Sequence, residues 1–138
     1  VMNDVIKEES EYLDYFFDKS YDNLKGYLEK FILQIKKRYA KEEQNSMQFI
    51  LRMAYMPPLH LKEEVINNFN IYFLKLENLI KDLFLEDLFL EEKANMATLS
   101  FMNMLNGLLV TLIYGGCERF DLKFKASWKV YWAGLNKE

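Results

Sequence analysis

From Ala94 to Cys117 the chain reads ANMATLSFMNMLNGLLVTLIYGGC, which is 24 consecutive residues without a charged side chain. A helix that is apolar on nearly all sides is surrounded by protein or by lipid, because water solvates it poorly. A membrane span would leave Asn95, Asn103 and Asn106 in need of partners inside hydrocarbon. The flanking charges have mixed sign and would not orient a span. We therefore expect no membrane partner, and a helix buried by its own domain on one side and by a second subunit on the other.

The composition indicates one helical domain that covers residues 1–138. Hydrophobic residues make up 51% of the chain, while only 5 Gly and 2 Pro interrupt it, which favours long helices over many short strands. The net charge of −3, without a clustered Lys/Arg face, argues against direct nucleic-acid binding by this chain. A single cysteine, Cys117, cannot form an intramolecular disulfide and suits the reducing cytoplasm.

Apolar residues recur at helical spacing in five further segments. The pattern predicts helices over 2–18, from about 24 to 39 with Ser20 or Asp22 as N-cap, over 42–55, over 59–85 and over 121–135. Pro57-Pro58 ends the third of these helices, because proline lacks an amide proton. Gly115-Gly116 ends the uncharged helix. The fold class is therefore all-α, a bundle of about six helices with no strand.

Residues suited to catalysis are sparse. The single histidine, His60, is followed by Glu63 and Glu64, which are too few ligands for a typical metal site. Cys117 has no second histidine to act as its base. The sequence contains neither a phosphate-binding glycine loop nor a dinucleotide-binding fingerprint. We expect no enzyme activity, no catalytic residue, no metal and no cofactor.

Binding of a small molecule has more support, because several predicted helices mix Met, aromatic and isolated polar residues, with Tyr55 among them. Met adapts its shape to a ligand, aromatics provide flat contact area, and an isolated Asn or Arg orients a bound molecule. A Met-rich core, with the Asn side chains bonded to backbone or to each other, is the alternative. The candidate ligand contacts are Phe49, Arg52, Met53, Met56, Tyr72, Met102, Asn103 and Asn106.

The last two predicted helices are too apolar for the surface of a monomer. Two such pairs around a twofold axis would form an intermolecular four-helix bundle in a homodimer. Gly107 would allow a neighbouring helix to approach closely. The expected interface residues are Leu105, Leu109, Leu112, Phe124, Trp128, Tyr131 and Trp132.

Four segments together resemble the C-terminal regulatory domain of the TetR/AcrR family of bacterial transcriptional repressors. MNDVIKEES (2–10) resembles the helix that links this domain to the DNA-binding head. FILRMAYMPP (49–58) is similar to the helix and break before the family's long pocket-lining helix. FMNMLNGLL (101–109) resembles the penultimate helix, and WKVYWAGL (128–135) resembles the closing helix.

The resemblance implies a sensor that dimerises through its last two helices and encloses a small apolar or amphipathic effector. Effector binding would shift the separation of two N-terminal helix-turn-helix heads and so regulate transcription by changing DNA affinity. The sequence contains no such head, so DNA would be a partner only through that segment of the parent protein. The alternative function is a purely structural helical dimerisation module without a ligand.

Overall fold

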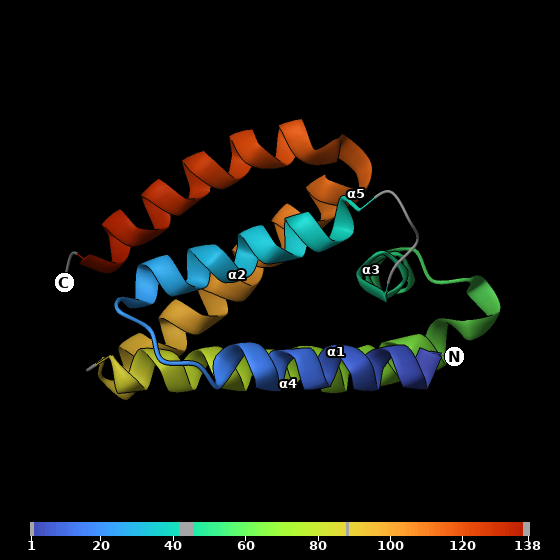
Figure 1. Cartoon of the computed structure of the whole chain (residues 1–138), viewed down its shortest axis with the longest axis horizontal. Helices are drawn as coiled ribbons and strands as arrows, with labels where there is room; N and C mark the ends of the chain where they lie inside the picture. Colours follow the sequence, from blue (N-terminus) through green and yellow to red (C-terminus); the bar gives the residue numbers. More distant parts are fainter. Residues whose placement is uncertain (1, 42–45, 88, 137–138) are drawn as a thin grey trace.

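The computed structural model describes residues 2–41, 46–87 and 89–136, and every regular element in these ranges is helical (Figure 1). The all-α prediction is confirmed. In these ranges the uncharged run and the last predicted helix form one continuous element with a kink at Gly116, so five α-helical elements are described. The elements are α1 (Met2–Phe17), α2 (Leu24–Tyr39), α3 (Ser46–Tyr55), the short 3-10 helix η1 (Leu59–Leu61), α4 (Lys62–Glu86) and α5 (Glu91–Asn136).

The N-cap of α2 is Asn23. Its side-chain Oδ1 accepts a hydrogen bond from the Gly26 backbone N–H at 2.7 Å. Ser20 and Asp22 were the predicted caps, and this prediction is wrong. A capping side chain has to reach an N–H three residues further on, and Asn23 directly precedes the first helical residue.

The predicted break after α3 is confirmed. The α3 helix ends at Tyr55, and Pro57-Pro58 separates it from η1 and α4. The Met56 N–H still donates to the Arg52 carbonyl at 2.7 Å, whereas neither proline has an N–H with which to continue the pattern.

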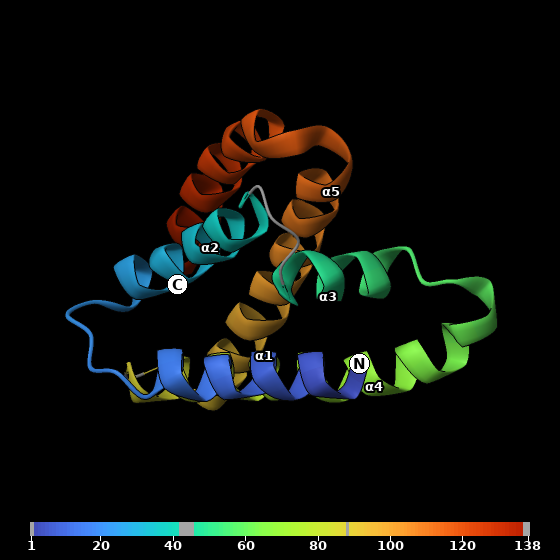
Figure 2. The same ribbon diagram turned by 45° about the vertical axis from the view of Figure 1, so that its right-hand side comes forward.

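The long helix α5 bends sharply at Gly116, where φ is 81° and ψ is 177°. Residues with a Cβ rarely adopt a positive φ of this kind, so glycine is needed here. The bend divides α5 into a first half (91–115) and a second half (117–136), which fold back on each other as a hairpin (Figure 2). The two predicted helices are thus present, but without a loop between them.

The helices pack in two pairs that the first half of α5 connects. In both ribbon views α1 and α4 run side by side in the same direction, while α2 lies beside the second half of α5 (Figures 1 and 2). The first half of α5 starts at the end of α4 and leads to the second pair. The α3 helix closes one end of the fold and contacts α1, α2, α4 and α5.

The α5 helix is also apolar and long enough to cross a membrane, and half of its most apolar window is buried inside the fold. Core helices of soluble proteins share these properties. Phe101, Leu105, Leu109 and Leu112 of this helix belong to the buried core of the chain.

Candidate functional site

Three of the eight predicted ligand contacts, Met102, Asn103 and Asn106, line one hollow between α4 and the first half of α5. Its volume of about 490 Å³ falls in the range of small-molecule sites. Amide and carboxylate groups alternate with apolar side chains around it, so the hollow has an amphipathic lining. The other lining residues are Asn70, Phe73, Leu74, Glu77 and Leu99.

One hydrogen bond connects this hollow to α3. The Tyr55 hydroxyl donates to the Asn106 Oδ1 atom at 2.6 Å. Burial raises the pKa of Tyr55 to about 12, so the hydroxyl keeps its proton at neutral pH and remains a donor. Tyr55 belonged to the mixed set of residues in the sequence but not to the candidate contacts. Its place at the C-terminal end of α3, just before the proline break, was the feature of the sequence that could have identified Tyr55 as a contact residue.

The other five candidates do not line this hollow. Phe49 and Met53 are half-buried on α3, while Arg52 and Met56 are exposed. Tyr72 is buried on α4, where it is close to a different polar group. The eight residues therefore do not form one site.

The polar group near Tyr72 is a buried ion pair between α1 and α2. The Glu9 carboxylate is 1% exposed, and its Oε2 atom lies 2.5 Å from Nη2 of Arg38. The Arg38 guanidinium also stacks on Tyr12, 4.0 Å from the ring centroid. Burial, followed by the Glu9 charge, raises the pKa of Tyr72. Sequence reasoning missed Glu9, although its position between Ile6 and Leu13 places it within the apolar stripe of α1.

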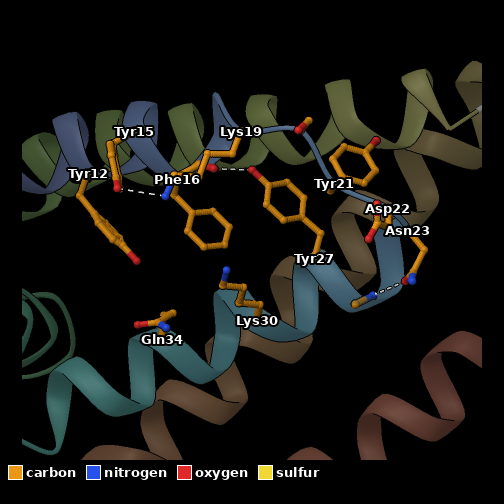
Figure 3. A pocket seen from close by; sticks show the side chains of 12 residues that line it. Tyr12, Tyr15, Phe16, Lys19, Tyr21, Asp22, Asn23, Tyr27, Lys30 and Gln34 are labelled. Atoms are coloured by element: carbon orange, nitrogen blue, oxygen red, sulfur yellow. Dashed lines mark hydrogen bonds between the residues drawn. The ribbon is translucent and has the colours of Figure 1, made fainter.

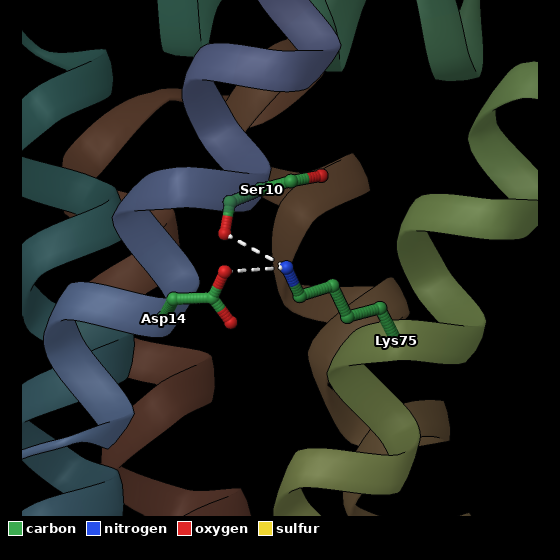
Figure 4. Close-up of polar contacts among 3 residues, drawn as sticks. All are labelled: Ser10, Asp14 and Lys75. Atoms are coloured by element: carbon green, nitrogen blue, oxygen red, sulfur yellow. Dashed lines mark hydrogen bonds and ion pairs between the residues drawn. The ribbon is translucent and has the colours of Figure 1, made fainter.

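A second polar contact joins α1 to α4, the helix that forms one wall of the hollow. The Lys75 ammonium donates to the Asp14 carboxylate at 2.9 Å and to the Ser10 carbonyl at 3.2 Å (Figure 4). Lys75 follows Leu74 of the hollow directly in sequence. The Asp14 side chain is 64% exposed, so this ion pair lies at the surface between the two helices.

The residues predicted for the dimer interface pack inside the single chain. The Trp128 ring contacts Phe101 in the first half of α5, the Trp132 ring contacts Phe84 of α4, and the Tyr131 hydroxyl donates to the Ala97 carbonyl at 2.5 Å. Tyr131 is half-buried, and the buried members of the set are Leu105, Leu109, Leu112, Phe124, Trp128 and Trp132.

The opposite side of the hairpin carries a groove of about 550 Å³ between the two halves of α5. Gly107, Ala126 and Ser127 line it together with larger side chains such as Met104, Leu108 and Tyr131, and a Cβ added at Gly107 would meet no atom within 4 Å. Exposed apolar residues border it, including Val130, which is 73% exposed. We refer to this surface as the outer face. It consists of the groove residues and of Val110 and Tyr114, which are exposed on the same stripe of the helix. The groove residues are Asn103, which also lines the hollow, Met104, Gly107, Leu108, Lys123, Ala126, Ser127, Val130 and Tyr131.

Comparison with known proteins yields no assignment: no family model matches the chain, and a search of the curated proteins finds no match. In the ranges that the structure describes, no three His, Cys, Asp or Glu side chains are grouped so that they would hold a metal ion. His60 is exposed and Cys117 is half-buried. Any functional proposal therefore depends on the geometry of the hollow and of the outer face.

Proposed function

We propose that this chain is the effector-sensing and dimerisation domain of a TetR-like transcriptional regulator, located in the cytoplasm. The observation that carries the proposal is the outer face of α5. A helical hairpin with small and apolar residues on its solvent side is suited to pairing with a second hairpin, as in a four-helix bundle.

The chemistry of the outer face favours close helix packing. Gly107, Ala126 and Ser127 have little or no side chain, so a second helix can approach the backbone. The Lys123 ammonium donates to the Thr111 hydroxyl of the same hairpin at 3.3 Å, which gives this charge a partner within the groove. Two copies related by a twofold axis would bury Val110 and Val130 against their equivalents.

The hollow between α4 and α5 is the proposed effector site, and its lining suits a small amphipathic molecule. Such a ligand would contact Phe73 and Leu74 on α4 and Asn103 on α5. Lys75 would transmit a shift of α4 to Asp14 on α1, the helix that resembles the family's linker to the DNA-binding head. The ligand would then favour one of two α1 positions and so change DNA affinity by a population shift.

Light scattering tests the dimer directly. We expect the wild-type chain to have twice the mass of one copy, and the double variant Ala126→Glu/Val130→Glu to be monomeric because it buries four carboxylates in the paired faces. Ile71→Glu is the matched control, since Ile71 is 70% exposed on α4, away from the hairpin. A monomeric wild-type chain would remove the proposal.

Native mass spectrometry of the chain purified from its host distinguishes the sensor from the structural module. A dimer with a defined additional mass supports the sensor. Asn70→Trp fills the hollow from an exposed position and should abolish that mass, while Asn78→Trp, on the same helix but outside the lining, should retain it. A dimer without added mass, even after incubation with a library of amphipathic compounds, favours the structural module.

A further inference from the structure

A second cavity lies at the turn between α1 and α2, away from both the hollow and the outer face. Its volume is about 530 Å³ (Figure 3). Seven of its side chains are aromatic or cationic, an unusual concentration for a surface turn. The lining residues are Tyr12, Tyr15, Phe16, Lys19, Ser20, Tyr21, Asp22, Asn23, Gly26, Tyr27, Lys30 and Gln34.

The aromatic wall of the cavity is ordered by its own contacts. Tyr27 stacks between Tyr21 and Phe16, with ring centroids 4.8 and 5.0 Å apart and an interplanar angle of 9° in both pairs. The Tyr27 hydroxyl donates to the Phe16 carbonyl across the turn. Because Phe16 also stacks on Tyr12, the faces of Phe16 and Tyr27 are covered within the stack, and this wall presents ring edges to the cavity. A planar ligand would contact these edges in an edge-to-face arrangement, with little reorganisation of the wall.

Two lysines provide the positive charge. The Lys19 ammonium lies 3.0 Å from the Tyr15 hydroxyl and 4.2 Å from the centroid of that ring. Figure 3 shows Lys30 pointing into the same space as Tyr12 and Gln34. Within the described ranges Lys30 makes no ion pair or hydrogen bond, so its ammonium is available to an incoming acceptor.

The charge balance of the lining selects the class of ligand. Lys19 and Lys30 contribute two positive charges to the lining and Asp22 contributes one negative charge. The carboxylates of Asp18, Glu86 and Asp87 act on the Tyr21 and Tyr27 hydroxyls, so the positive charge is confined to the lysine end. Asp22 lies on the far side of Tyr27 from Lys30 (Figure 3). A monoanion would thus be neutralised at the lysine end, while a polyphosphate would exceed the available charge.

We propose that this cavity binds a small aromatic carboxylate. The carboxylate would accept hydrogen bonds from Lys30 and Lys19, and the ring would pack against the aromatic wall formed by Tyr12, Phe16 and Tyr27. Such charge-assisted hydrogen bonds are stronger than neutral ones. This site is separate from the proposed effector hollow and does not require the chain to be a dimer.

Isothermal titration of the full chain with naphthoate, and with neutral naphthamide as the matched ligand, tests the proposal. We expect naphthoate to bind and naphthamide to bind about tenfold more weakly or worse, because a charge-assisted hydrogen bond is worth roughly one decade of affinity. Equal affinity for the two compounds, or no binding of naphthoate at millimolar concentration, would overturn the proposal.

Variants locate the binding. Lys30→Gln and Lys19→Gln should each weaken naphthoate binding about tenfold, and Lys30→Arg should retain it. Lys37→Gln is the control, because Lys37 is an exposed lysine of the same helix outside the cavity. Both glutamine substitutions replace exposed side chains, and circular dichroism will verify that the fold is kept. Binding that survives both glutamine substitutions would place the ligand elsewhere and refute the assignment.

The outcome is independent of the proposed regulatory function. Naphthoate binding by a monomeric chain would support this site and contradict the proposed dimeric sensor. A dimer that does not bind naphthoate would contradict this site and leave the proposed dimeric sensor in place.

Discussion

The inner and outer faces of the α5 hairpin differ in polarity and in how deeply their side chains are buried. The inner face contains Phe101, Trp128 and Trp132, which are at most 6% exposed and pack against one another and against α4. The outer face contains Gly107 and Val130, where little side-chain volume covers the backbone. Large aromatics therefore complete the core of one chain, whereas the outer face leaves Val130 exposed and open space beside Gly107.

The largest expected effect comes from truncating the inner face. Trp128→Ala should destabilise the fold by about 3–5 kcal/mol, because it removes a buried indole and leaves a cavity between the halves of α5. Urea unfolding monitored by circular dichroism measures this change. A loss below about 1 kcal/mol would mean that Trp128 is not a core residue of the single chain.

Tyr131→Phe should cost less, about 1 kcal/mol at neutral pH, because it removes the hydrogen bond to the Ala97 carbonyl. Burial raises the pKa of Tyr131 in the folded chain. The stability that depends on the neutral phenol is therefore complete below the unfolded pKa of about 10 and falls as the pH rises above it. Chemical unfolding at pH values on both sides of 10 should show that the free energy of unfolding falls less steeply with pH in the Phe variant than in the wild-type chain. An unchanged slope would contradict the assigned burial of this hydroxyl.

Thr98→Val, on the inner face, should raise the free energy of unfolding of the chain by about 1 kcal/mol. The Thr98 hydroxyl is buried without a hydrogen-bond partner in the described part of the chain, and an unsatisfied buried hydroxyl is costly. Thr111→Val is the matched control, since the Thr111 hydroxyl donates to the Gly107 carbonyl at 2.9 Å. Equal effects of the two substitutions on the urea midpoint would argue against this reasoning.

The smallest expected effect on folding comes from the outer face. Val130→Glu should change the stability of the monomer by less than about 0.5 kcal/mol, because the side chain is 73% exposed. Unfolding at a protein concentration that keeps the chain monomeric measures the effect of the substitution on the free energy of unfolding of the monomer alone. A large loss would place Val130 in the core and erase the distinction between the two faces.

Much of the fold was predictable because helical periodicity and chain breakers are local signals. The all-α class, the break at Pro57-Pro58 and the end of the uncharged helix at Gly115-Gly116 all followed from the sequence. The absence of a loop between the last two predicted helices did not, because a single residue at φ 81° reverses the chain direction. The choice of Asn23 as N-cap was missed for a similar reason, since several polar residues compete in that turn.

The candidate site was less predictable, because periodicity shows that a residue is buried but not what buries it. Trp128 and Trp132 were predicted to lie in a subunit interface, whereas the single chain already buries both side chains. Met102, Asn103 and Asn106 came together because they lie on adjacent turns of one helix. Arg52 and Tyr72 are on separate elements, and only tertiary packing decides where such residues meet. The homodimer and its effector stay predictions.

The Gly116 bend also makes the hairpin a candidate for domain swapping. Any residue with a Cβ at this position disfavours the positive φ and favours a straight α5. A straight helix would carry residues 117–136 away from their own core. The indoles of Trp128 and Trp132, which are buried in the bent form, would then be exposed. The vacated site of a second copy would accept them, and exchange of identical elements is a low-cost route to a dimer. Gly116→Val would then form an exchanged dimer in which the same side-chain contacts are made between two chains instead of within one.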